Sequence, residues 1–484
     1  MDDLRRRFAS LDRLHTPDLW DEIELRAAVL GSAERVARVP VPIRVRSRSR
    51  GLSGRTAVVL LVAAALLVGV MAGAFIVGSR LMPPPPSPAP SPTTLATASA
   101  EVTPSLPSTP TVTIGRFVSA GSLVEGRAFH SAVALSDGRV LVIGGQGSTD
   151  VTAGNMLDSI EVWDPIRGAF TASGQMQRAT WGDQYFGPFV FRMTDGRALI
   201  IPKGCSCKPP PGSTPAQVWN PVAGVRPMEH LIVHADLFTA TQLANGKVLI
   251  AGGTYGLVGD PAEVWDPVAD VIEPTGPVAH VRYGAAATLL TDGRVLVLGG
   301  VAQEGQGIDT TSVPVREAEV WDEASGTFST AFTFETGPGY AHPRGPELFA
   351  VTLQDGRVLV LNEAGARVWD PIDNTLSEAG AFPEARSEFS ATLLADGRVL
   401  VAGGRPVIPD GRGPSIASTL LWSPSTGGFE PGPELSEARA THTATLLRDG
   451  RVLIVGGVSS GSAYPGLDTV ALAEVWVPLP ADGP

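Results

Sequence analysis

Five arginines recur at a nearly fixed distance before an Asp-Gly turn, and together they could bind an anion. Four lie ten residues before the Asp of the turn and one lies eleven residues before it, namely Arg127, Arg282, Arg386 and Arg439, and Arg344. Guanidinium groups gathered on one rim could hold a carboxylate, sulfate or phosphate through paired hydrogen bonds. In the alternative interpretation, which we regard as the more common case, each arginine ties neighbouring repeats together by pairing with a carbonyl or an acid. We treat all five as candidate ligand-binding residues.

Two histidines occupy matching places in this pattern. His130 and His442 each stand three residues after one of the arginines. Imidazole binds several metals, so a ligand pair is conceivable. The equivalent positions of other repeats hold apolar residues such as Pro188 and Phe238, which indicates a packing position. We therefore predict structural histidines and no metal site.

The two cysteines form a Cys-Ser-Cys triplet at Cys205 and Cys207. If this part of the chain lies outside the cell, the two cysteines could form a local disulfide, although so small a ring is strained and easily reduced. A soft metal would need further ligands that the sequence does not identify. We predict a local disulfide here.

Other features limit the possible chemistry. The formal net charge of -12 argues against nucleic-acid binding, which needs a basic surface. The chain contains no HExxH motif and no phosphate-binding glycine loop. We therefore predict no cofactor, and we favour a binding role over an enzyme.

These candidate residues belong to a repeated phrase that returns seven times. Its Asp or Asn stands at positions 137, 195, 245, 292, 355, 396 and 449, with spacings between 41 and 63 residues. A second phrase of the form EVWDP follows each copy, as at Glu161. A period of about 50 residues is typical of toroidal repeat arrays.

The sequence pattern within each repeat predicts four antiparallel strands. Apolar stretches flank the Asp-Gly pair, which is typical of a type I′ hairpin. The EVWDP phrase is a third strand that ends in a Pro turn, and a segment such as GAFTASG after Trp163 is a short fourth strand. Four-stranded units repeated radially form the blades of a β-propeller.

The repeats resemble the kelch family over residues 113–480. That family has a Gly doublet after the second strand, present here as at Gly144 and Gly145, and an aromatic residue further along. The aromatic residue is always Trp, at positions 163, 219, 265, 321, 369, 422 and 476. Two repeats lack the doublet and carry Pro202 with Lys203, and Asn362 with Glu363. We expect the tryptophans to form blade core rather than a sugar-stacking platform.

The resemblance implies an all-β fold, a seven-bladed kelch-type β-propeller. The last repeat lacks its outer strand, and residues 115–122 match the missing segment. We expect this segment to complete the seventh blade. Long second loops in the first, fourth, sixth and seventh blades are expected to carry recognition.

Kelch propellers also form the central domain of galactose oxidase-type enzymes. Such enzymes are known for a copper held by two Tyr and two His, with one Tyr cross-linked to Cys. The tyrosines available here lie in no evident motif, at positions 185, 255, 283, 340 and 464. Such an enzyme, acting on carbohydrate or another small molecule, is an alternative.

Upstream of the propeller the sequence predicts a membrane anchor. Residues 56–78 are 23 residues without a charge, long enough for one transmembrane helix. Residues 1–55 are Arg-rich with a short amphipathic helix, so the positive-inside rule predicts that they are cytoplasmic. Residues 79–112 are a Pro/Ser/Thr-rich stalk, predicted to be disordered. The propeller would then lie outside the cell membrane.

The function predicted from these features is a membrane-anchored extracytoplasmic module that binds a protein or glycan through the long-loop rim. There are two alternatives: the propeller enzyme, and a single-span transmembrane sensor. The sequence names no ligand.

Overall fold

The computed structural model describes eleven stretches of the chain. They are residues 115–147, 156–177, 187–202, 216–228, 238–253, 261–280, 282–304, 311–334, 348–409, 411–459 and 468–479. The chain divides into two units, Met1–Pro104 and Ser105–Pro484, and every described residue belongs to the second. The predicted cytoplasmic segment, transmembrane helix and stalk lie outside the described residues. Within the described stretches, no helix has the length and apolar character needed to cross a membrane.

The described residues form four-stranded antiparallel sheets, the architecture of a β-propeller. We call the sheets blades and number them along the chain. Blade 1 contains β2 (Ser131–Ala134), β3 (Val140–Ile143), β4 (Ser159–Asp164) and β5 (Ala169–Gln175). Blade 2 contains β6 (Phe189–Arg192), β7 (Ala198–Ile201), β8 (Gln217–Asn220) and β9 (Gly224–Pro227). Blade 3 contains β10 (Thr239–Gln242), β11 (Val248–Ala251), β12 (Pro261–Asp266) and β13 (Val271–Pro277).

The later blades repeat this order with insertions. Blade 4 contains β14 (Ala286–Leu289), β15 (Val295–Leu298), β18 (Glu317–Asp322) and β19 (Thr327–Thr333). Blade 5 contains β20 (Phe349–Thr352), β21 (Val358–Asn362), β22 (Gly365–Asp370) and β23 (Thr375–Ala381). Blade 6 contains β25 (Ser390–Leu393), β26 (Val399–Ala402), β29 (Thr419–Ser423) and β30 (Gly428–Pro431). Blade 7 contains β31 (Thr443–Leu446), β32 (Val452–Val455), β33 (Leu472–Pro478) and, at its edge, β1 (Gly115–Ser122).

Two of the predicted long loops form additional strands. The second loop of blade 4 folds into a ribbon of β16 (Val301–Glu304) and β17 (Thr311–Pro314). In blade 6, β24 (Arg386–Ser387), β27 (Arg405–Ile408) and β28 (Gly411–Arg412) form a small three-stranded sheet. Hydrogen-bonded strands make these loops more regular than sequence patterns indicated.

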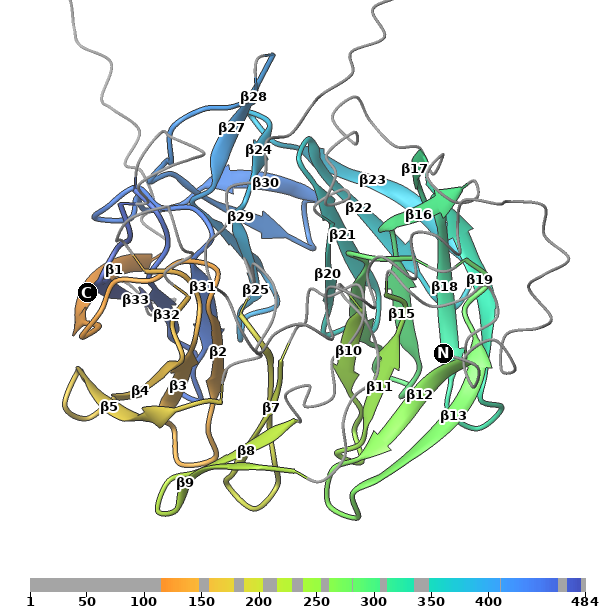
Figure 1. The fold of residues 1–484 in the computed structure, drawn as a ribbon. Coiled ribbons are helices and arrows are strands. Elements are labelled where there is room, and N and C mark those ends of the chain that lie inside the picture. Colours follow the sequence, from red (N-terminus) through yellow and green to blue (C-terminus); the bar gives the residue numbers. More distant parts are fainter. Residues whose placement is uncertain are drawn as a thin grey trace, which may run out of the picture. The chain divides into compact units, whose positions relative to one another are not determined.

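The blades lie side by side around a common centre, and the two ends of the repeat region meet (Figure 1). β1 pairs antiparallel with β33, with Phe117 opposite Trp476. The prediction that residues 115–122 complete the last blade is therefore confirmed. The paired strand covers an edge of β33 that would otherwise expose unpaired backbone groups.

The hairpin that opens each blade differs from the predicted type I′ turn. Within the turns only the Gly has a positive φ, as at Gly138 (φ 90°). The preceding Asp137 instead accepts a hydrogen bond from the Arg139 backbone N–H at 3.0 Å and pairs with its guanidinium. This side-chain bond stabilises a longer turn in which one residue adopts the left-handed conformation.

The core consists of hydrophobic clusters between neighbouring blades. The seven kelch-type tryptophans are at most 2% exposed, which confirms them as core residues. Each packs on the inner strands of the preceding blade, as Trp219 of blade 2 packs with Leu141 and Ile143 of blade 1. Trp163 of blade 1 packs with Leu453 of blade 7, so the same contact joins the first and last repeats.

The Gly doublets are explained by a close approach of backbone. Gly144 and Gly145 have φ of 66° and 89°. A Cβ on Gly145 would lie 2.5 Å from the Ala128 carbonyl oxygen. Only Gly fits this position, because the segment that enters the blade passes directly against the doublet.

Candidate functional site

Three of the predicted arginines form buried ion pairs inside their own blades. Arg127 Nη2 lies 2.6 Å from Glu161 Oε1, and Arg439 Nη2 lies 2.7 Å from Glu474 Oε1. Arg282 pairs with Glu319 in the same way. All six side chains are 2% exposed or less. We call these the buried Arg–Glu pairs.

The remaining hydrogen-bonding groups of each pair are also occupied. Arg127 Nη1 donates to the carbonyl oxygens of Gly144 and Ser159, both at 3.1 Å. The second oxygen of Glu161 accepts the backbone N–H of Val124 at 2.8 Å. Burial lowers the pKa of Arg127, and the charge of Glu161 opposes that shift. These contacts favour a structural role for the arginines. Anion binding by them stays a prediction.

Sequence reasoning missed the glutamates of these pairs. Each is the first residue of an EVW phrase, in blades whose entering segment also carries the arginine. The two residues therefore occur together in the repeats of blades 1, 4 and 7. That co-occurrence was the available signal for their contact.

Blade 6 keeps the arginine but lacks the glutamate. Leu420 occupies the position of Glu161, and Pro383, which has no N–H, occupies that of Val124. Arg386 is 3% exposed and donates through Nη1 to Gly403 and Ser418 carbonyl oxygens at 3.4 and 3.3 Å. Its guanidinium carbon lies 5.7 Å from the centre of the Phe382 ring. Blade 6 thus lacks both the carboxylate of the buried pair and the backbone N–H that would donate a hydrogen bond to it.

Blade 5 reverses the charge at the same position. Arg367 replaces the glutamate, and its Nε lies 2.8 Å from Glu378 Oε1. The predicted ligand-binding residue Arg344 precedes this blade in the sequence and lies outside the described residues. Blade 5 is also one of the two repeats without a Gly doublet, and its second loop is a tight hairpin between Asn362 and Gly365.

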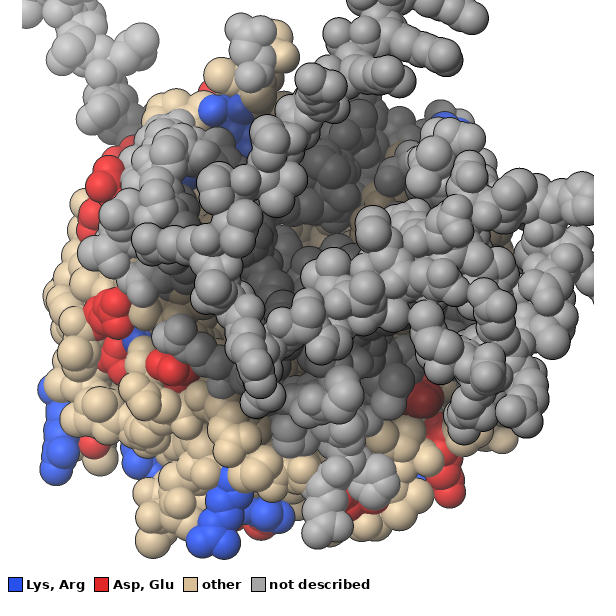
Figure 2. All heavy atoms as spheres, viewed as in Figure 1, with Lys and Arg blue, Asp and Glu red and all other residues tan. Residues whose placement is uncertain are grey.

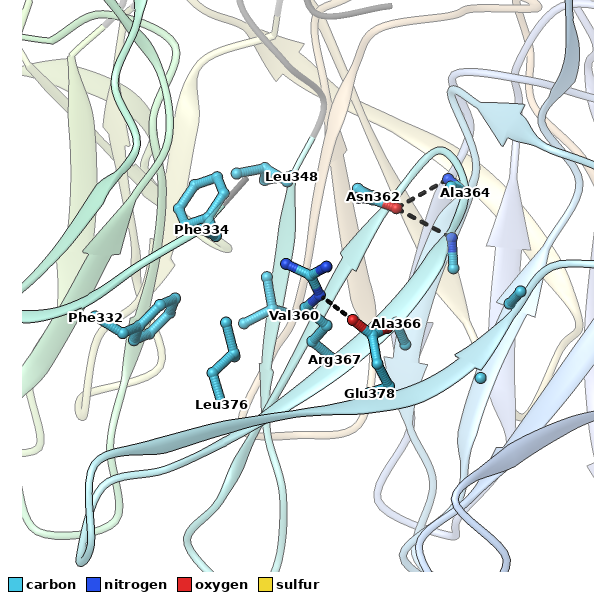
Figure 3. Close-up of a pocket in the computed structure, with 13 residues that line it drawn as sticks. Phe332, Phe334, Leu348, Val360, Asn362, Ala364, Ala366, Arg367, Leu376 and Glu378 are labelled. Atoms are coloured by element: carbon cyan, nitrogen blue, oxygen red, sulfur yellow. Dashed lines mark hydrogen bonds and ion pairs between the residues drawn. The ribbon is translucent and has the colours of Figure 1, made fainter. Parts of the chain in front are cut away.

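A cavity of about 180 Å³ lies between blades 4 and 5, beside this hairpin (Figure 3). Phe332, Phe334 and Leu348 supply an apolar side, each 9% exposed or less. Arg367 and Glu378 supply the polar side. The cavity therefore combines an apolar surface with one guanidinium group and the carboxylate that is paired with it.

The two histidines connect neighbouring blades. His130 Nε2 lies 2.8 Å from Thr443 Oγ1 of blade 7, and His442 Nε2 lies 2.8 Å from Ser390 Oγ of blade 6. Burial, together with the nearby Arg127 or Arg439, lowers the pKa of each imidazole to about 3. The two rings contact different blades, which agrees with the structural role predicted for them.

The described residues do not supply a copper site. They contain no group of three or more His, Cys, Asp and Glu side chains that could hold a metal. Tyr283 is the one tyrosine among them, and both buried histidines face hydroxyl groups. Cys205 and Cys207 lie outside the described residues, so their predicted disulfide stays a prediction.

Charged side chains of the described residues are interspersed over the visible face, without an extended basic area (Figure 2). The arginines of the Asp-Gly-Arg turns are half-buried, and the acid of the turn pairs with them, as Arg357 pairs with Asp355 at 2.6 Å. Such local pairing leaves little net field at the turns.

Comparisons with known proteins identify two kinds of similar protein. No family model matches the sequence. Two galactose oxidases of Gibberella zeae are each 24% identical over 299 residues, which cover 56% of this chain and 41% of the relative. This chain thus spans less than half the length of those relatives. A solved structure of a fungal alcohol oxidase of the AA5 family, in complex with copper, matches with a TM-score of 0.51 and 18% identity, over 76% of this chain and 78% of that one.

These matches overturn the prediction of a binding module. The similar proteins are oxidases, so they favour the alternative of a propeller enzyme. The sequence argument failed because propeller active sites are assembled from distant loops and leave no short motif. The comparisons do confirm the resemblance inferred from the repeats: the chain is similar, in sequence and in fold, to galactose oxidase-like kelch propellers.

Proposed function

We propose that this protein is an enzyme of the galactose oxidase type that acts on a carbohydrate or another small alcohol. The match to galactose oxidases over 299 residues carries the proposal. An oxidase of this kind takes two electrons and two protons from an alcohol and passes them to dioxygen, which gives an aldehyde and hydrogen peroxide.

The rim that carries the second loops is where we place the substrate. Loops on a rigid scaffold usually carry function, and the second loops of blades 4 and 6 are long enough to form extra strands. The buried Arg–Glu pairs fix the segments that enter the blades beneath this rim. In this proposal they are positioning residues that keep the loops in register.

Copper chemistry would need ligands beyond the described residues, because the donor set found there does not fit it. Histidines and tyrosines outside those residues are His15, His230, His234 and His342, and Tyr185, Tyr255, Tyr340 and Tyr464. We assign no ligand role to any of them.

An assay of hydrogen peroxide tests the proposal. The purified full chain, incubated with copper(II) and then freed of excess metal, would be given galactose or benzyl alcohol in air. We expect peroxide and aldehyde in equal amounts, and loss of both after treatment with a chelator. A heat-denatured sample with the same copper content is the control. Copper-loaded protein that produces no peroxide above this control with either substrate would contradict the proposal.

We also propose that the four-stranded sheets close into a ring of seven blades. The pairing of β1 with β33 and the packing of Trp163 on blade 7 support closure. The membrane anchor at residues 56–78 and the extracytoplasmic location stay predictions from the sequence.

A further inference from the structure

We propose that the cavity between blades 4 and 5 binds a small carboxylate with an apolar body, such as an aryl or alkyl acid. This site is independent of the proposed oxidase activity, because it is defined by residues of the blade walls. The juxtaposition of Arg367 with an apolar surface carries the inference.

The cavity corresponds to the space that a buried Arg–Glu pair fills in other blades. Strand pairing aligns Val360 and Arg367 of blade 5 with Val142 and Glu161 of blade 1. By the same alignment, Asn362 takes the place of Gly144, whose carbonyl oxygen holds Arg127. Asn362 and Arg367 both line the cavity. The cavity thus lies at the strand positions where blade 1 has Glu161 and the carbonyl oxygen that holds Arg127.

The charge of β22 at this position is the opposite of that in the blades with a buried Arg–Glu pair. A guanidinium on β22 replaces the buried carboxylate, so the matching partner is an anion rather than an arginine. Charge complementarity therefore selects an anionic occupant.

The guanidinium of Arg367 is oriented to receive a carboxylate. Its Nε pairs with Glu378 Oε1, while the two terminal nitrogens face the cavity (Figure 3). The Glu378 side chain is 76% exposed, so water screens its charge, whereas the Arg367 side chain is 37% exposed. Two parallel N–H groups match the two oxygens of a carboxylate.

The apolar side of the cavity determines the body of the ligand. Phe332 and Phe334 lie with ring centres 6.1 Å apart, and Leu348 and Val360 continue the same surface. A volume of about 180 Å³ admits a single ring or a short alkyl chain rather than a polymer. A carboxylate on such a body would place its charge at Arg367 and its apolar part on the phenylalanines.

A ¹⁹F NMR titration with 4-fluorobenzoate tests the site on the full chain. We expect saturable binding that Arg367→Gln weakens about tenfold or more, because a charge-assisted, bidentate contact is lost. The matched control is Arg357→Gln, an arginine of the same blade whose ion pair with Asp355 lies in the exposed turn. It should leave the dissociation constant unchanged. A second variant, Ala381→Phe, would fill the cavity from an exposed position and should also weaken binding.

The neutral analogue 4-fluorobenzamide separates charge recognition from simple apolar binding. We expect it to bind at least about tenfold more weakly than the acid. Equal binding of the acid and the amide, equal binding by the wild type and Arg367→Gln, or no saturable binding of the acid would each overturn the proposal. Since the titration measures no peroxide, its failure and a failure of the oxidase proposal are distinguishable.

Discussion

At the scale of single residues, the buried Arg–Glu pairs explain why arginine recurs before the turns. Each pair joins the segment that enters a blade to the second loop and the third strand of that blade. The backbone of the same segment also bonds to the preceding blade, because Gly457 N donates to the Arg127 carbonyl oxygen at 2.8 Å. One residue thus connects two neighbouring blades.

Removal of one partner should be costly only where a buried carboxylate is left behind. Arg439→Leu would leave Glu474, which is 1% exposed, without its cation, and should lower the free energy of unfolding by about 3 to 5 kcal/mol. Arg386→Leu is the matched control, since Leu420 stands in place of the acid, and its effect should be smaller by about 2 kcal/mol. Urea unfolding followed by tryptophan fluorescence would compare them. Equal losses in the two variants would contradict the role given to the glutamate.

The buried histidines should make the fold sensitive to mild acid. Their pKa values of about 3 in the folded protein lie below the ordinary 6.5, so between these values the unfolded chain binds more protons. Stability should therefore fall as the pH drops below 6.5, by about 2 kcal/mol for each histidine at pH 5. Urea unfolding at pH 7.5 and pH 5 would measure this.

A comparison of variants isolates the histidine contribution. The double variant His130→Gln and His442→Gln should lose most of the difference between the two pH values. His280→Gln, in which a half-exposed imidazole is removed, should keep it. If the double variant were as acid-sensitive as the wild type, other groups would be responsible.

At the scale of elements, the sequence predicted the strands well because each has a repeated local cause. The Asp-Gly turn, the Trp of the third strand and the Gly doublet fix where every blade begins and turns. The turn type was wrong, because the Asp137 carboxylate binds the Arg139 N–H and allows a longer turn. The ribbons in the second loops of blades 4 and 6 were also missed, since they have no counterpart in the other repeats.

The candidate site could be predicted only in part, because its residues act across repeats. Arg367 is visible in the sequence as RVW among EVW phrases. That the substitution lies beside a hollow follows only from the pairing of β21 with β22 and from Phe334 on the neighbouring blade. Departures from a repeat therefore indicate where a site is, while the packing of two blades determines what it can bind.

At the scale of the whole molecule, the buried Arg–Glu pairs and the additional three-stranded sheet lie in different blades. The buried Arg–Glu pairs occupy blades 7 and 1, which meet at the closure, and blade 4. The adjacent blades 5 and 6 have lost the acid, and they carry the cavity and the additional sheet of β24, β27 and β28. The blades where the chain ends meet thus carry buried ion pairs, whereas blades 5 and 6 carry the cavity and the additional sheet.

The closing strand should decide whether the propeller is stable. A chain that starts at residue 113 keeps β1, whereas a chain that starts at residue 123 leaves β33 without its partner and removes the Ala120 carbonyl oxygen that accepts the Trp163 Nε1–H at 2.9 Å. We expect the shorter chain to lose at least about 3 kcal/mol of stability, because apolar contacts at the junction of blades 7 and 1 are lost. We also expect it to self-associate through the exposed edge. Thermal unfolding and light scattering would compare the two chains, and equal midpoints with both chains monomeric would show that β1 does not close the ring.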